Sequence, residues 1–213
     1  IKKPLMSLNA HNGDRQIPKL LRILEEHDLA FTTDAGTPGV SDPGHKLVQA
    51  AQHSSTRIIP IPGASSITSA LSVAPFPIDS FYFAGFVPRR TKDIVKLIEK
   101  LGDLNVPIVF FESPHRVINF LSALIKIEPD IKILVMREMT KLHEERFYGT
   151  ATEAMAYFQE ARGEFTLVME PFNRDSKAPD DKEISEIISS FSGKVSGTKE
   201  LAGIISQSTG LTR

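Results

Sequence analysis

The sequence predicts an α/β protein whose first part holds a mostly parallel sheet. Short apolar runs alternate along the chain with segments in which apolar residues recur at helical spacing. Loops rich in glycine and proline separate the two kinds of segment, as at 34–44 and 62–64. The chain has 213 residues, of which 41% are hydrophobic and 24% charged, so it can form one large domain or two small ones.

The first part is expected to alternate helices and strands, each identified from the spacing of its apolar side chains. Its third helix follows a strand-to-helix turn, where Ser65 or Ser66 would serve as the N-cap. In chain order we expect a helix at 17–27, a strand at 29–33, a helix at 45–54, a strand at 57–61, a helix from the serine pair to 73, a strand at 80–86 and a helix at 92–100.

A second part begins near 105, where the strands come closer together and predict a mixed sheet. We expect a strand at 107–111, a helix at 114–127, strands at 131–136 and 145–149, a helix at 152–160, a strand at 164–170, a polar linker at 172–181 and helices at 182–190 and 198–208. This pattern divides the chain into an N-terminal α/β domain at 1–104, a C-terminal α/β domain at 105–172, and a linker with a helical tail at 173–213.

The composition argues against several classes of protein. No apolar run is long enough to span a membrane, and no signal-peptide pattern is present. The absence of cysteine excludes disulfides and thiolate metal sites, and the six histidines include no i, i+4 pair, so no metal centre is expected. A formal net charge of −1 gives no general attraction to nucleic acid, so any RNA contact needs a local basic patch.

Three common ligand-binding or catalytic motifs are missing. The sequence has no G-x-G-x-x-G after a strand, no P-loop and no G-x-S-x-G nucleophile elbow. Instead, a polar turn follows each of several predicted strands, which would bring these turns to one edge of the sheets. The turns lie at 34–38, 63–66, 85–90, 112–116 and 137–141.

The stretch 31–44 is the most informative of these turns. Gly36 and Gly39 allow positive φ and close approach of a ligand to the backbone, and Pro38 stiffens the loop. One interpretation is a ligand-binding loop at the carboxyl end of a strand. The other is a turn that leads into the following helix, in which Asp34 forms the turn through its own side chain.

Together and in order, five motifs resemble the ribosomal small subunit methyltransferase I family of the tetrapyrrole-methylase class. They are Asp-Ala-Gly-Thr-Pro at 34–38 with Ser-Asp-Pro-Gly at 41–44, Pro-Gly-Ala-Ser-Ser at 62–66, Glu-Ser-Pro-His-Arg at 112–116, Arg-Glu-Met-Thr-Lys at 137–141 and Gly-Glu-Phe at 163–165. The resemblance, which extends from about Leu5 to Pro171, implies two α/β domains with a cofactor cleft between them. It implies S-adenosylmethionine-dependent methylation of a cytidine 2′-hydroxyl in 16S ribosomal RNA, free or in the 30S subunit.

The resemblance also assigns binding residues to this chain. Their small side chains suit contacts made mainly through the backbone. The implied adenosylmethionine contacts are Asp34, Ala35, Gly36, Thr37, Pro38, Val40, Ser65, Ser66, Glu112 and Ser113. Residues near Arg137, Glu138, Glu164 and Phe165 would close over the adenosine. The family implies a homodimer, a cytoplasmic location and no membrane association.

Methyl transfer to a ribose hydroxyl is an in-line displacement that needs positioning and help from a nearby base or cation. The candidate bases are Glu112, His115 and Glu138, and the candidate cations are Arg116, Arg137 and Lys141. Structural roles are the alternatives. Arg137 and Glu138 would form a local ion pair at a strand end, and Glu112 and Ser113 would cap the helix that His115 and Arg116 begin.

A basic cluster follows the strand expected at 80–86. Arg89, Arg90 and Lys92 would contact RNA phosphates, or they are ordinary solvated surface. The neighbouring Phe86 would stack on a base or belong to the core, and the core is the interpretation we favour.

The chain departs from the family at both ends. The first strand–helix unit of the family and the end of its helical tail have no counterpart here, so we expect an incomplete N-terminal domain that binds cofactor poorly and is inactive by itself. Two other functions stay open. One is a methyltransferase of the same class acting on a tetrapyrrole or a diphthamide precursor, which the 112–116 and 137–141 motifs disfavour, and the other is a non-catalytic binding remnant.

Overall fold

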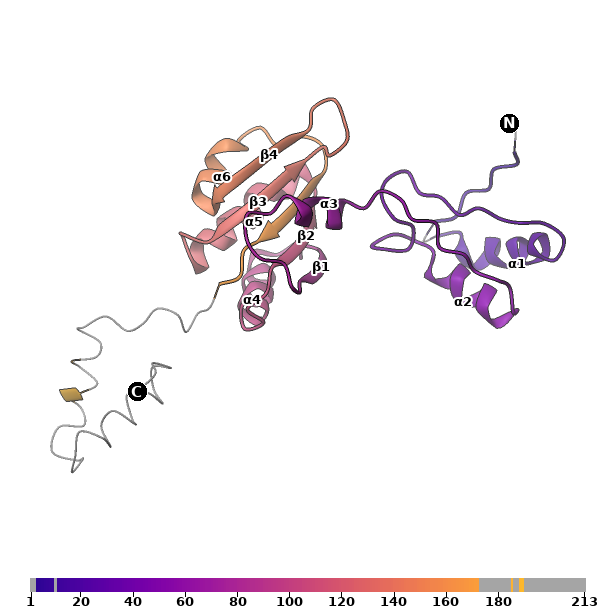
Figure 1. The fold of residues 1–213 in the computed structure, drawn as a ribbon, viewed down its shortest axis with the longest axis horizontal. Coiled ribbons are helices and arrows are strands. Elements are labelled where there is room, and N and C mark those ends of the chain that lie inside the picture. The colour runs from indigo at the N-terminus through magenta and orange to yellow at the C-terminus, as the bar shows by residue number, and fades with distance from the viewer. Residues whose placement is uncertain (1–2, 10, 173–184, 186–187, 190–213) are drawn as a thin grey trace. The chain divides into compact units, whose positions relative to one another are not determined.

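A computed structural model describes residues 3–9, 11–172, 185 and 188–189 (Figure 1). The chain forms two compact units, Ile1–Pro75 and Phe76–Arg213. The expected domain boundary at 104/105 differs from this division and falls inside the second unit. The reason is strand pairing, because β1 (Tyr82–Phe86) is the parallel neighbour of β2 (Ile108–Glu112).

The second unit is built on a five-stranded mixed sheet with the order β1-β2-β5-β3-β4. The remaining strands are β3 (Lys132–Arg137), β4 (Glu145–Thr150) and β5 (Phe165–Met169). β5 runs antiparallel to both β2 and β3, and β4 runs antiparallel to β3. The predicted mixed sheet is confirmed. Since β1, β2 and β3 are mutually parallel, their carboxyl ends lie at one edge of the sheet.

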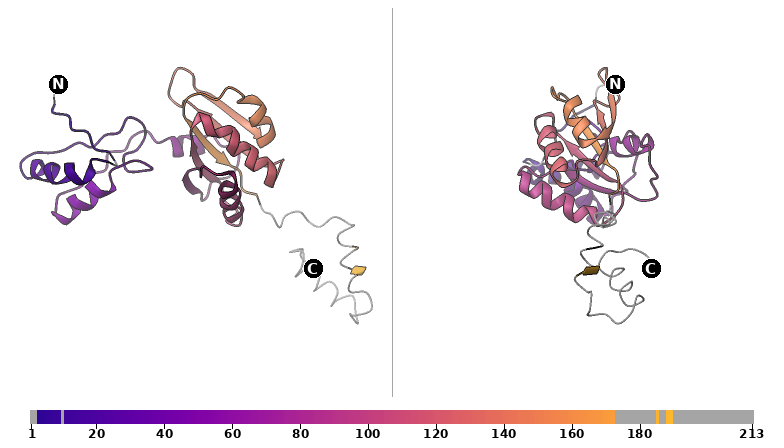
Figure 2. Two further views of the ribbon diagram at one scale, coloured as in Figure 1. Left: turned by 180° about the vertical axis from the view of Figure 1, so that it is seen from behind. Right: turned by 90° about the vertical axis from the view of Figure 1, so that its left-hand side faces the viewer.

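Three helices pack on one face of this sheet and enclose the hydrophobic core (Figures 1 and 2). They are α4 (Thr91–Gly102), α5 (Pro114–Ile127) and α6 (Ala151–Tyr157). Within α5, Pro114 occupies the first turn, where its missing N–H costs nothing. Val117, Phe120, Leu121 and Leu124 share its buried face at the helical spacing that the sequence shows. All helices and strands expected between 80 and 170 are confirmed, with shifts of a few residues at their ends.

The first unit contains three helices, α1 (Gly13–Leu24), α2 (His45–His53) and α3 (Ser66–Ser72). An ion pair of 2.7 Å between Lys46 Nζ and Asp14 Oδ1 links α2 to α1. Ser65 is the N-cap of α3, as expected, although its hydroxyl accepts no capping hydrogen bond. The three predicted helices of this unit are therefore confirmed.

The two strands predicted in the first unit, at 29–33 and 57–61, are wrong. Neither segment belongs to a strand in the described part of the chain. A strand needs a hydrogen-bonded neighbour, and neither segment pairs with a described residue. Apolar side chains that the prediction would bury are exposed, with Ile58 at 47%, Ile59 at 59% and Ile61 at 82%.

The linker predicted at 172–181 and the helices predicted at 182–190 and 198–208 lie outside the described residues, apart from 172, 185, 188 and 189. Within the described ranges, no helix is long and apolar enough to cross a membrane.

Candidate functional site

Three of the predicted polar turns meet at the carboxyl edge of the second unit's sheet. The turns at 85–90, 112–116 and 137–141 follow β1, β2 and β3, which run in the same direction. Their convergence is confirmed. The turns at 34–38 and 63–66 belong to the first unit.

Glu112 ends β2 with a buried carboxylate. Its Oε1 atom accepts a 2.7 Å hydrogen bond from the Ser113 backbone N–H and lies 2.6 Å from Nη2 of Arg116. The side chain is 1% exposed, and Oε2 has no hydrogen-bond partner among the described residues. A buried carboxylate is stable only when it is paired. Arg116 therefore compensates the charge of Glu112, and Oε2 remains able to accept one more hydrogen bond.

The alternative that this turn caps α5 is confirmed only for the position of Ser113 in the chain. Ser113 is the N-cap of α5, but its hydroxyl makes no capping hydrogen bond. The hydroxyl oxygen instead accepts a 3.3 Å hydrogen bond from Nε of Arg116. Arg116 is thus held by both Glu112 and Ser113. His115 is exposed at the start of α5, and its side chain makes no hydrogen bond or ion pair with another described residue.

Arg137 lies in the same row of the sheet as Glu112. Phe165 on β5 is the cross-strand partner of both residues, and Arg137 in turn faces Glu145 on β4. Directly opposed residues place their side chains on the same face of a sheet. Nη1 of Arg137 donates a 2.9 Å hydrogen bond to Glu145 Oε2, while its buried Nε has no partner among the described residues. The row therefore places a carboxylate and a guanidinium on either side of a buried aromatic ring.

The alternative of a local ion pair between Arg137 and Glu138 is wrong, because each pairs elsewhere. Glu138 bonds to Lys141 Nζ at 2.9 Å and to the Glu164 N–H at 2.8 Å, both through Oε1. Lys141 also reaches Glu164 Oε2 at 3.0 Å, and the Glu138 N–H donates to the Glu164 carbonyl. We call this set, Glu138, Lys141 and Glu164, the clasp. It ties the β3–β4 loop to the segment that leads into β5.

The backbone of the clasp requires a glycine. Gly163 has a φ of +81°, and a Cβ on it would overlap the carboxyl group of Glu138. Within the clasp, the hydrogen bond from Lys141 is the main cause that lowers the pKa of Glu138, and the Glu164 N–H adds to it. The same contact with Glu138 raises the pKa of Lys141. Both groups are therefore held in their charged forms.

In the first unit, the loop predicted to bind cofactor lies beside the turn at 62–66. Thr37 Oγ1 donates a 3.3 Å hydrogen bond to the carbonyl of Ala64. Gly36 and Gly39 have φ values of +70° and +81°, and a Cβ on either would meet no atom within 4 Å. Of the backbone N–H groups at 34–40, Val40 alone donates to another described residue. The loop therefore offers unpaired donors next to open space. Asp34 is exposed and forms no hydrogen bond within the described chain that would make it a turn-former.

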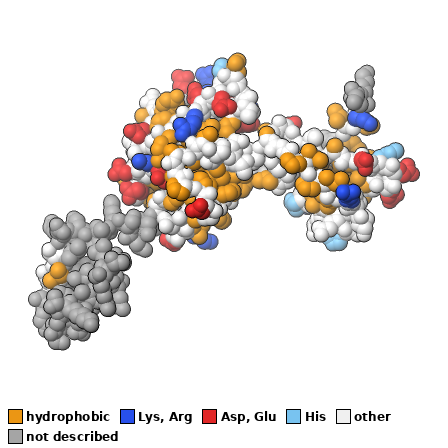
Figure 3. Space-filling view, in the orientation of Figure 1, with side chains coloured by type: hydrophobic (Ala, Val, Ile, Leu, Met, Phe, Trp, Pro, Cys, Tyr) orange, Lys and Arg blue, Asp and Glu red, His pale blue; other side chains and the backbone are white. Residues whose placement is uncertain are grey.

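The basic residues after β1 are exposed, and they differ in whether they form an ion pair. Nε of Arg90 bonds to Asp93 Oδ2 at 2.6 Å, whereas Arg89 and Lys92 make no ion pair with a described residue. On the face shown in Figure 3, Lys and Arg side chains are interspersed with Asp and Glu rather than gathered into one basic area. Any RNA contact through charge would therefore be local.

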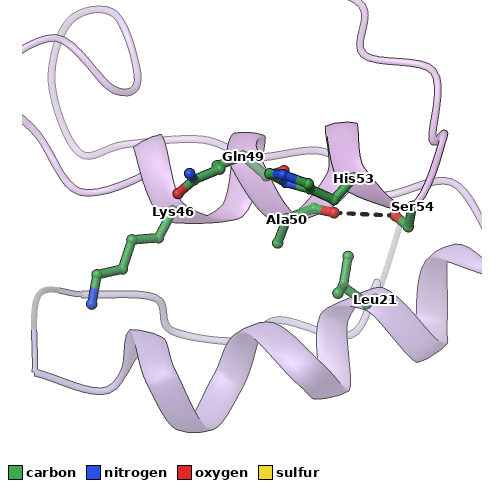
Figure 4. A pocket seen from close by; sticks show the side chains of 6 residues that line it. All are labelled: Leu21, Lys46, Gln49, Ala50, His53 and Ser54. Carbon is green, nitrogen blue, oxygen red and sulfur yellow. Dashed lines mark hydrogen bonds between the residues drawn. The ribbon is translucent and has the colours of Figure 1, made fainter.

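A shallow pocket has none of the predicted site residues in its lining. It is formed in the first unit between α1 and α2 (Figure 4), where His53 Nδ1 and the Gln49 carbonyl are 2.7 Å apart. Its lining residues are Leu21, Lys46, Gln49, Ala50, His53 and Ser54. The pocket is therefore not part of the candidate site.

Sequence reasoning missed Glu145 as the partner of Arg137. Phe165 and Glu164 were noted only as residues that would close over an adenosine. The strands that form β3 and β4 were predicted, but the register that places Glu145 opposite Arg137 depends on the length of the connecting loop.

The fold and the ordered turns define a class of protein. Residues 6–155 match the family model of the Tetrapyrrole (Corrin/Porphyrin) Methylases, and the chain belongs to this family. Solved structures with the same fold include diphthine synthase, with a TM-score of 0.57, 13% identity, and coverage of 79% of this chain and 70% of that one. Another is the uroporphyrin-III C-methyl transferase from Thermus thermophilus complexed with S-adenosyl homocysteine, with a TM-score of 0.52, 16% identity, and coverage of 75% and 73%.

Within the family, the chain is similar to proteins named ribosomal RNA small subunit methyltransferase I. It is 41% identical to that of Thermotoga maritima over 79% of this chain and 77% of the relative. It is 33% identical to that of Neisseria meningitidis serogroup B over 99% of this chain and 74% of the relative. The relative from Bacillus subtilis is 36% identical over 82% of this chain, which spans 61% of that protein.

Proposed function

We propose that this chain is a methyltransferase that transfers a methyl group from S-adenosylmethionine to ribosomal RNA of the small subunit. The observation that carries the proposal is the similarity, at 33–41% identity over most of the chain, to relatives named for that activity. The fold neighbours named for other substrates are 13–18% identical, which supports the fold alone.

The residues present suit S-adenosylmethionine. Gly36 and Gly39 leave room where side chains would stand, and the N–H groups around them, apart from that of Val40, lack partners among the described residues. Such a loop can approach a ligand closely and donate hydrogen bonds from its backbone. In the second unit, the buried Oε2 of Glu112 can accept a hydrogen bond from a ligand N–H or O–H. We propose these as cofactor contacts, together with Asp34, Ala35, Thr37, Pro38, Val40, Ser65, Ser66 and Ser113.

When bound, the cofactor supplies an activated methyl group on a sulfonium, so the protein has to position the acceptor and help remove its proton. Glu112 and Glu138 are both engaged by cations, through Arg116 and Lys141. His115 is exposed and has no described partner. We propose His115 as the first candidate for the proton acceptor, and Arg116, Arg137 and Lys141 as groups that orient carboxylates and balance charge at this edge.

The acceptor we propose is the 2′-hydroxyl of a cytidine in 16S ribosomal RNA, presented free or within the 30S subunit. The basic residues Arg89, Arg90 and Lys92, at the same edge of the sheet as Glu112, support an anionic polymer as substrate. A homodimer in the cytoplasm, where small-subunit RNA is found, is part of this proposal. Static light scattering on the purified protein tests the dimer.

A gene deletion tests the function in the cell. The 16S ribosomal RNA of the deletion strain should lack one 2′-O-methylcytidine, and expression of the whole reading frame should restore it. Mass spectrometry of nuclease fragments locates the nucleotide. An unchanged set of RNA methylations in the deletion strain would refute the proposed substrate.

A further inference from the structure

An irregularity in β1 changes the direction of an aromatic side chain. The pairing of β1 with β2 joins Phe83 to Val109 and Gly85 to Phe110, so that Ala84 is the extra residue of a bulge. Gly85 has a φ of +71°, which a residue with a side chain rarely adopts. Bulges redirect the side chains that follow them. Phe83 and Phe86 consequently lie on the same side of the strand, although they are three residues apart.

Both rings pack against the half-buried ring of Phe111 on β2. The Phe83 and Phe111 centroids are 5.0 Å apart, and the Phe86 and Phe111 centroids are 5.7 Å apart, both in edge-on arrangements. Phe86 is 56% exposed, so our expectation that it belongs to the core is wrong. The contact with Phe111 holds the ring in place while one side of it faces solvent.

The exposed ring, the two cations that lack a described partner and Glu112 belong to the same edge of the sheet, with the ring on the face opposite to the Glu112 side chain because Phe86 pairs with Phe111. Arg89 follows Phe86 by three residues and has no ion-pair partner among the described residues, and neither has Lys92. Phe86 is opposite Phe111, the residue before Glu112, so the ring lies at the carboxyl edge of the sheet. A rigid aromatic platform beside cations is the arrangement by which proteins bind single-stranded nucleic acid.

We propose that Phe86 stacks on a nucleobase of a single-stranded RNA segment, while Arg89 and Lys92 bind the adjacent phosphates. This proposal rests on the proposed function, because it assumes an RNA substrate. Stacking depends on the base and hardly on salt, whereas phosphate contacts depend on salt and hardly on the base. The two parts of the subsite can therefore be measured separately.

The chain offers a matched control for the aromatic substitution. Tyr157 on α6 is 57% exposed and also leans on other rings, Phe147 at 5.1 Å and Phe158 at 4.8 Å. The charged residues nearest to it in sequence are acidic, Glu153 one turn earlier on α6 and Glu160 shortly after the helix ends. Tyr157→Leu therefore removes a ring with similar exposure and similar ring contacts, and we do not expect this ring to bind RNA because its neighbours in sequence are acidic.

The test compares two RNA probes, an oligocytidylate and an abasic ribose-phosphate chain of the same length. The wild-type protein should bind the oligocytidylate more tightly, and Phe86→Leu should weaken that binding roughly 5- to 150-fold, the range typical of one base–aromatic stack. Phe86→Leu should leave binding of the abasic chain and the salt dependence unchanged, and Phe86→Trp should retain the preference for bases. Tyr157→Leu should bind both probes as the wild type does.

Equal binding of both probes by the wild-type protein, or the same preference in Phe86→Leu, would overturn the stacking proposal. Thermal unfolding and adenosylmethionine titration of each variant show whether the substitution has damaged the protein elsewhere. The methylation pattern of the deletion strain is measured independently, so failure of the stacking subsite is distinguishable from failure of the proposed function.

Discussion

The carboxylate of Glu112 and the guanidinium of Arg116 lie 2.6 Å apart across the first turn of α5, with the carboxylate buried and the guanidinium 27% exposed. The pair joins the carboxyl end of β2 to the helix that follows it. Because the Glu112 side chain is almost fully buried, its carboxylate is compensated by Arg116 and by the Ser113 N–H.

Replacing Arg116 by methionine should destabilise the protein by about 3 kcal/mol, because it leaves a buried carboxylate without its cation. Urea unfolding measures the change. Arg162→Met is the control, since Arg162 and Glu160 are exposed and 3.7 Å apart, and loss of a surface pair changes stability by about 0.5 kcal/mol or less. Equal effects of the two substitutions would show that Glu112 does not need Arg116.

Gly163→Ala should destabilise the second unit because the new Cβ displaces the Glu138 carboxyl and opens the clasp. We expect a loss of about 2 kcal/mol, of which the left-handed backbone accounts for about half. In a Glu138→Ala background the clash is absent, so the same substitution should cost less. Equal costs in the two backgrounds would contradict the packing of Gly163 against Glu138.

The clasp should weaken in acid. The pKa of Glu138 is lowered in the folded protein, first by the hydrogen bond from Lys141. Its contribution to stability is therefore fully present above the unfolded-state pKa of about 4.3 and is lost as the pH falls through the lower folded-state pKa. NMR titration of the Glu138 side chain measures this pKa, and Lys141→Met should move it upwards. A Glu138 pKa that is the same in the wild-type protein and in Lys141→Met would rule out the clasp in solution.

The helices of the second unit could be predicted from the sequence because the spacing of their apolar side chains is decided locally. The spacing of Val117, Phe120 and Leu124 identifies α5 without knowledge of its neighbours. The strands at 29–33 and 57–61 failed because a strand depends on a partner from elsewhere, which apolar spacing does not report. The ion-pair partner of Arg137 was predicted wrongly for the same reason. Glu138 is next to Arg137 in sequence, but the register of β3 and β4 places Glu145 opposite Arg137.

Gly36→Val should abolish adenosylmethionine binding while the rest of the fold remains. A Cβ at this position meets no protein atom, so the added side chain would occupy space that we assign to the ligand. Calorimetric titration measures binding, and thermal unfolding shows whether the protein is intact. Gly36→Asn separates the effect of backbone strain from the effect of side-chain volume, because asparagine tolerates positive φ better than valine. Normal cofactor binding by Gly36→Val would remove the loop from the cofactor site.

Arg89→Glu should flatten the dependence of RNA affinity on salt, since each lost phosphate contact lowers the slope of log K against log salt by about one. Arg90→Glu should have a smaller effect, because Arg90 is already paired with Asp93. Filter binding at several salt concentrations measures both slopes, and cofactor affinity should stay the same in each variant. Unchanged slopes would mean that the cluster is ordinary surface.

Methyl transfer in vitro tests the central claim most directly. The protein expressed from its whole reading frame is incubated with S-adenosylmethionine carrying a labelled methyl group and with 30S subunits from the deletion strain. We predict label in 16S ribosomal RNA at the 2′-oxygen of one cytidine, recognised by the resistance of its 3′ phosphodiester to alkali. Label that enters a tetrapyrrole or a diphthamide precursor offered in parallel, with none in the RNA, would contradict it.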